Sequence, residues 1–71
     1  MFKIELLLRN SNSTLLVQRK SEEEANALYE QILAAMTADK IQALKLSCER
    51  HSKTRIAVLN NAIMAVNLTE S

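Results

Sequence analysis

The sequence predicts an α+β protein in which one helix covers one face of a single, mostly antiparallel sheet, in the order β-β-α-β-β-β. Only residues 21–36 repeat their apolar side chains at helical spacing, while the other apolar runs alternate or are too short for a stable helix. Two alternating segments precede this stretch and three apolar segments follow it. A two-layer arrangement of helix on sheet therefore accounts for the whole pattern.

The first two alternating segments, residues 1–9 and 14–20, are expected to form a hairpin. Their expected core positions are Phe2, Ile4, Leu6, Leu8, Leu15 and Val17. The connection between them, residues 10–13, contains no glycine. The two asparagines of this connection can replace glycine, because asparagine tolerates left-handed backbone angles.

The helix is expected to begin at Ser21, whose side chain can cap free backbone N–H groups together with Glu24. Acidic residues at positions 22–24 favour this start because they complement the helix dipole. The expected buried stripe consists of Ala25, Leu28, Tyr29, Ile32 and Met36. The end of the helix is expected to fray near residues 38–40, where no glycine is available as a cap.

Alternation resumes in residues 44–49 and again in residues 54–59, separated by a polar turn. The expected inward positions are Leu44, Leu46, Cys48, Ile56 and Val58. Asn60 and Asn61 are expected to break the second of these strands before a last strand over residues 62–69.

A chain of 71 residues has room for one domain, residues 1–71, and chains of about 70–80 residues or fewer rarely gain more than roughly 3–5 kcal/mol from a single core. Cys48 is the only cysteine, so an intrachain disulfide is excluded, and no Cys and His cluster suggests a structural metal. Association with a second copy is the remaining route to stability, and a homodimer is therefore predicted.

The face of the sheet opposite the helix is expected to be unusually apolar. Leu7 and Leu16 point to that face if the alternation holds, and the later strands add the candidate positions Ala57, Leu59, Ile63 and Ala65. Three interpretations remain open: a curled sheet that hides these residues, a homo-oligomer, and a docking face for another protein. Leu7, Leu16, Leu59 and Ile63 are the candidate oligomer or partner residues.

The formal net charge of +1 gives no field strong enough to argue for a nucleic acid or a membrane surface. The strand order could still bring basic residues to one edge as a modest anion-binding strip of Arg19, Lys20, Arg50, Lys53 and Arg55. A solvated edge that discourages aggregation is the competing interpretation. Phe2 and Tyr29 are the only aromatic residues and both are expected in the core, so no stacking platform for nucleic-acid bases is predicted.

No catalytic motif is found. The complete absence of glycine excludes phosphate-cradling and dinucleotide-binding loops. Cys48 and His51 could form a nucleophilic pair, but Cys48 is expected to point inward while His51 lies in an exposed turn. The acidic residues at 22–24 are explained by the helix start, so no paired acid and base emerges. We therefore predict that the protein is not an enzyme and has no cofactor, metal or small-molecule substrate.

A cytoplasmic location is expected. No apolar run approaches the roughly 18 residues of a membrane helix, and Lys3 and Glu5 interrupt the apolar amino-terminal run, unlike a secretory signal.

Four segments together resemble a family of short cyanobacterial proteins with no assigned activity. They are LLVQRKS (residues 15–21), ALYEQILAAM (27–36), LKLSCER (44–50) and RIAVLNNAIMAV (55–66), in the same order along nearly the whole chain. The resemblance implies a bacterial cytoplasmic protein of photosynthetic origin, and it supplies no binding residues.

The predicted function is that of a non-enzymatic, homo-oligomeric module for protein binding or for an adaptor role. The alternative is a weak nucleic-acid or anion binder that uses the basic clusters at 19–20 and 50–55. Affinity that falls steeply with salt would distinguish the second function from the first.

Overall fold

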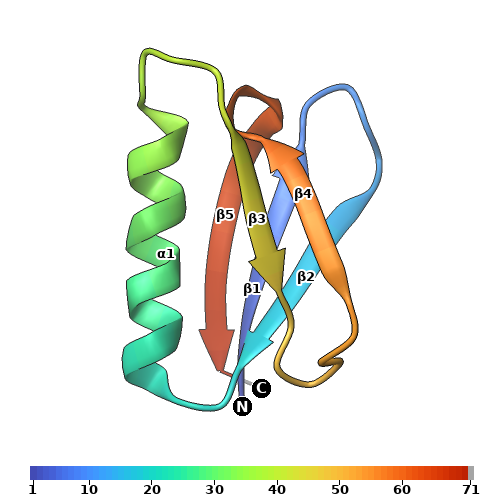
Figure 1. Ribbon diagram of the computed structural model, residues 1–71, viewed down its shortest axis with the longest axis vertical. Coiled ribbons are helices and arrows are strands. Elements are labelled where there is room, and N and C mark those ends of the chain that lie inside the picture. The colour runs from blue at the N-terminus through green and yellow to red at the C-terminus, as the bar shows by residue number, and fades with distance from the viewer. Residues whose placement is uncertain (71) are drawn as a thin grey trace.

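The computed structural model describes residues 1–70 and has the predicted α+β class and order of elements (Figure 1). The elements are β1 (Phe2–Leu8), β2 (Thr14–Arg19), α1 (Glu22–Met36), β3 (Ala43–Ser47), β4 (Arg55–Leu59), a short 3-10 helix η1 (Asn60–Ala62) and β5 (Ile63–Glu70). All strand pairs are antiparallel, as predicted. Most of the observed ends of the helix and strands differ from the predicted ends by one or two residues.

The five strands are divided between a three-stranded sheet of order β2-β1-β5 and a two-stranded ribbon of β3 and β4. The helix contacts all three strands of the larger sheet, and the ribbon also packs over that sheet (Figure 1). The backbone N–H of Glu49, just beyond β3, donates to the carbonyl of Gln18 in β2 over 3.1 Å. The ribbon is thereby joined to an edge of the larger sheet at one corner.

The connection between β1 and β2 uses asparagine where a glycine would be common. Asn10 has a φ of 57°, in the left-handed region, as the sequence predicted. The Ser11 hydroxyl accepts a hydrogen bond from the Ser13 N–H over 3.0 Å and stabilises the turn.

The helix begins as predicted, because the Ser21 side chain accepts a hydrogen bond from the Glu24 N–H over 3.2 Å. At its end, the Thr37 hydroxyl donates to the Ala34 carbonyl over 3.1 Å and satisfies one of the free carbonyls of the last turn. Ala25, Leu28 and Ile32 are buried, as the helical spacing predicted. The described part of the chain contains no helix with the length and apolar character needed to cross a membrane.

One hydrophobic cluster receives side chains from both sheets and from the helix. Its buried members are Ile4, Leu6, Val17, Ala25, Leu28, Ile32, Ala35, Leu44, Leu46, Val58 and Ile63. Because the inner faces of the larger sheet and of the ribbon both pack into this cluster, their outer faces point away from each other.

Ile63 belongs to this core, so its predicted place on the open sheet face is wrong. Its side chain is only 2% exposed. The cause is a β-bulge: Leu7 pairs with Ala65, but Leu8 pairs with Ile63, which leaves Met64 as an extra residue in β5. One extra residue reverses the direction of the side chains on one side of the bulge, so Ile63 points inward although Ala65 points outward.

Candidate interaction surfaces

The outer face of the three-stranded sheet is a mixed surface with two neighbouring leucines. By register, its positions are Lys3, Glu5 and Leu7 of β1, Thr14, Leu16 and Gln18 of β2, and Ala65, Asn67 and Thr69 of β5. Leu7 is half-buried and Leu16 is 42% exposed. Leu16 is diagonal to Leu7 across the β1–β2 pair, so the two side chains are close enough to form one apolar patch. The only charges on this face, Lys3 and Glu5, have opposite signs.

A second candidate surface is the outer face of the ribbon, called here the ribbon face. It is formed by the cross-strand pairs Ala43–Leu59, Lys45–Ala57 and Ser47–Arg55, and Ile41 lies just before it in the chain. Ile41 is 66% exposed and Leu59 is 50% exposed. One half of the ribbon face is therefore apolar, and the other half carries the two cations of Lys45 and Arg55.

Leu59 does not share a surface with Leu7 and Leu16, contrary to the prediction from alternation. Its strand belongs to the ribbon, which turns its inner residue Val58 into the core and its outer residues away from the larger sheet. The four predicted partner residues are thus split three ways: one pair on the larger sheet, one residue on the ribbon face and one in the core.

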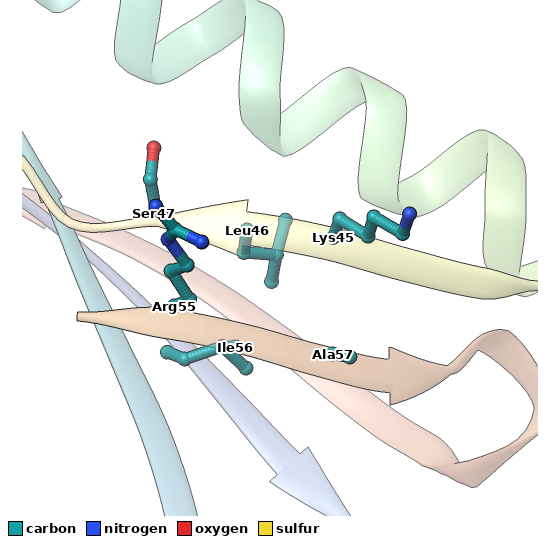
Figure 2. A pocket seen from close by; sticks show the side chains of 6 residues that line it. All are labelled: Lys45, Leu46, Ser47, Arg55, Ile56 and Ala57. Atoms are coloured by element: carbon teal, nitrogen blue, oxygen red, sulfur yellow. The ribbon is translucent and has the colours of Figure 1, made fainter. Parts of the chain in front are cut away.

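A shallow hollow of ≈470 Å³ lies along β3 and β4. It is lined by Lys45, Leu46, Ser47, Arg55, Ile56 and Ala57. Figure 2 shows the Arg55 side chain extending from β4 toward Ser47 on β3, with the Leu46 side chain between the two strands and the Ile56 side chain on β4. The hollow therefore combines apolar walls with the cationic half of the ribbon face.

The predicted basic strip is gathered at one end of the molecule. Arg19 ends β2, and its Nη1 donates to the Ser47 carbonyl over 2.6 Å; Ser47 in turn pairs with Arg55. The Lys20 N–H donates to Oε1 of Glu49 over 3.0 Å. Arg19 thus ties β2 to β3, and the Glu49 carboxylate lowers the positive potential beside Lys20.

Cys48 is buried directly after β3, as predicted, and His51 is exposed in the following loop. Burial raises the pKa of the Cys48 thiol, but backbone hydrogen bonds with His51, Gln18 and Arg50 and the charge of Arg19 together bring this pKa below the ordinary value of 9.0. Within residues 1–70, no three His, Cys, Asp or Glu side chains are placed to hold one metal ion.

We expect a thiol reagent to label Cys48 slowly in the native protein and rapidly in denaturant, because burial blocks access even to a thiol of lowered pKa. Labelling can be followed by mass spectrometry of the intact protein. The His51→Ala variant should label at the native rate. Fast native labelling that slows in His51→Ala would instead indicate an activated Cys–His pair.

Sequence reasoning missed Asn60, which it took only as a strand breaker. Asn60 is 3% exposed, and its Nδ2 donates to the carbonyls of Ala35 and Lys40, each over 2.9 Å. Its Oδ1 accepts from the Gln42 N–H, and its own N–H donates to the Gln42 carbonyl, again over 2.9 Å each. One buried amide therefore joins the end of α1, the following loop and the start of β3, and it fixes the chain on either side of the apolar half of the ribbon face.

A comparison with known families matches residues 3–71 to the UPF0367 protein family. A UPF0367 protein of Synechocystis sp. is 39% identical over 70 residues, which cover 99% of this chain and 75% of the relative. One from Acaryochloris marina is 40% identical over 70 residues, covering 99% and 80%, and one from Gloeobacter violaceus is 39% identical over 69 residues, covering 97% and 74%. No solved structure matches the chain. The names of these relatives assign no activity.

Proposed function

Because this chain belongs to the UPF0367 protein family, found across cyanobacteria, we propose a function from its own surfaces: a non-enzymatic cytoplasmic module that forms a homodimer and binds another protein. The proposal of a dimer rests on the apolar patch of Leu7 and Leu16 on the outer face of the three-stranded sheet. The burial of Cys48 and the exposure of His51 support a role without catalysis. A free cysteine is also compatible with a reducing compartment.

Charge favours this face over the ribbon face as the site of self-association. In a twofold dimer the same patch meets itself, so its charges have to be self-complementary. Lys3 and Glu5 can pair across such an interface, whereas Lys45 and Arg55 on the ribbon face offer a second copy only like charges.

The size of the face sets the expected affinity. With about 3.3 Å per residue along β1 and about 4.8 Å between strands, it measures roughly 23 Å by 14 Å, which is below the standard size of a stable protein–protein interface. We therefore expect a dimer with a dissociation constant in the micromolar range.

Sedimentation equilibrium across micromolar concentrations should show the native protein passing from monomer to dimer. Leu16→Lys should leave only monomer, because it places two like charges in the apolar centre of the interface. Leu59→Lys is the matched control: it makes the same change at a similarly exposed leucine on the ribbon face and should dimerise normally.

Circular dichroism of both variants would establish that each is folded. A native protein that stays monomeric throughout the range would refute the dimer, as would a folded Leu16→Lys variant that assembles like the native protein. Loss of assembly in Leu59→Lys alone would move the interface to the ribbon face.

The second candidate function is weak binding of an anion or nucleic acid at the basic end. The gathering of exposed Lys20, Arg50, Lys53 and Arg55 at this end favours it. Two observations weigh against it: the Glu49 carboxylate accepts a hydrogen bond from the Lys20 N–H and so places a negative charge beside Lys20, and the half-buried Phe2 and Tyr29 provide no exposed platform for stacked bases.

A further inference from the structure

We infer that the ribbon face is the partner-binding site, and that its partner is an acidic protein segment that also carries large apolar side chains. This inference deepens the binding role proposed above and rests on it. It depends on two features that lie side by side on this exposed face. One half of the face is apolar, and the other half carries two cations whose charge no residue of the face neutralises.

The apolar half requires an apolar partner surface. Ile41 and Leu59 are large apolar side chains that are half exposed or more, and Ala43, the cross-strand partner of Leu59, adds to the apolar surface beside them. Covering these side chains removes apolar surface from water, which favours association in proportion to the area buried. The Asn60 hydrogen bonds hold the neighbouring residues Gln42 and Asn60 in place, so the patch is presented on a fixed backbone.

The cationic half requires carboxylates. Lys45 and Arg55 are exposed and line the hollow from neighbouring strands, and neither the six residues of the ribbon face nor Ile41 is an Asp or Glu. The nearest acidic residue along β3, Glu49, is already hydrogen bonded to the Lys20 N–H. The hollow gives an acidic side chain room to approach Arg55 in the fork geometry that guanidinium groups favour.

Charge also selects among the possible occupants. A second copy placed symmetrically on this face would bring Lys45 and Arg55 toward their own equivalents, which costs free energy. A nucleic acid would satisfy the cations but would leave Ile41 and Leu59 against a polar backbone. An acidic and apolar protein segment satisfies both halves.

Selection of random twelve-residue peptides against the immobilised native protein tests the inference. We expect the enriched peptides to combine Asp or Glu with Leu, Ile or Phe. Binding of one enriched peptide, measured by fluorescence anisotropy, should weaken at least tenfold in Arg55→Glu and in Leu59→Ser. Lys3→Glu, on the opposite side of the molecule, is the matched control and should bind with native affinity.

A charge exchange makes the test specific. A peptide whose acidic residues are replaced by lysine should fail to bind the native protein and should recover binding to Arg55→Glu. Backbone amide shifts in nuclear magnetic resonance spectra should change mainly in residues 41–47 and 55–59, and the same spectra establish that each variant is folded. The monomeric Leu16→Lys variant should bind the peptide normally, so failure of the dimer and failure of this site give different results.

Several outcomes would overturn the inference. Enriched peptides without acidic residues, or shift changes centred on residues 50–53 or on the outer face of the three-stranded sheet, would place the site elsewhere. Shift changes in the ribbon residues on addition of a single-stranded oligonucleotide, with no peptide enriched, would assign the face to a nucleic acid. Concentration-dependent shift changes of the same residues without any added ligand would assign it to a second copy of the chain.

Discussion

Replacing Asn60 with alanine should cost about 2–4 kcal/mol of the free energy of unfolding. The change removes three side-chain hydrogen bonds, of which the one to Ala35 is buried and the other two are part-buried. The Lys40 carbonyl and the Gln42 N–H lose the Asn60 amide as their partner, while the Ala35 carbonyl keeps its hydrogen bond from the Ala38 N–H. A domain of this size rarely has more than roughly 3–5 kcal/mol to lose, so the variant should be partly or wholly unfolded at room temperature. Urea denaturation followed by circular dichroism measures the difference.

Asn61→Ala is the matched control, because this neighbouring asparagine is exposed and its hydrogen bond from Nε of Arg9 goes to the backbone carbonyl, which the substitution keeps. It should change the free energy of unfolding by no more than about 0.5 kcal/mol. Asn60→Asp adds a test of mechanism: the introduced carboxyl would face two carbonyl oxygens, so its pKa should rise and the variant should lose stability as the pH rises through that pKa. Equal stability of the Asn60 and Asn61 alanine variants would refute the role assigned to Asn60.

The helix could be predicted because its determinants are local. The Ser21 cap, the acidic first turn and the spacing of Ala25, Leu28 and Ile32 all lie within one segment, and each acts on neighbouring residues. The same holds for Asn10, whose left-handed backbone is a property of the turn itself. Alternation was also sufficient to predict most of the inward side chains, including Leu44, Leu46 and Cys48.

The division into a sheet and a ribbon could not be predicted in this way. Alternation tells which side chains of a strand face the core, but it does not tell which strands form hydrogen-bonded ladders. Leu59 was therefore assigned to the wrong surface although its alternation was correct. Ile63 was misplaced for a different reason: a single extra residue, Met64, reverses the alternation, and nothing in the local sequence marks the bulge.

The role of Asn60 depends on distant groups. Its amide bonds to residues 35, 40 and 42, which come together only when the helix, the loop and β3 are all in place. The available signal was a pair of asparagines between two apolar runs in a chain without glycine or proline. That signal predicts a change of direction, and the fold determines which of the two asparagines is buried.

Replacing Ile32 with alanine should be the most damaging change in the helix, at about 2–5 kcal/mol. Ile32 is fully buried in the cluster shared by α1 and both sheets, so its removal leaves a cavity that neighbouring residues can only partly fill. Set against the small total stability expected for the domain, the loss should leave little folded protein. Urea denaturation measures it, starting from conditions that stabilise the native state if the variant is unfolded in buffer.

Two variants show whether the cost arises from packing at this position. Ile32→Val removes a single methylene and should cost about 0.5–1.5 kcal/mol, which keeps the protein folded and the loss measurable. Glu30→Ala changes an exposed position on the same helix and raises helix propensity, so it should alter the free energy of unfolding by no more than about 0.5 kcal/mol. If Glu30→Ala were as costly as Ile32→Val, the helix would have to pack against the sheets through another face than the one that carries Ile32.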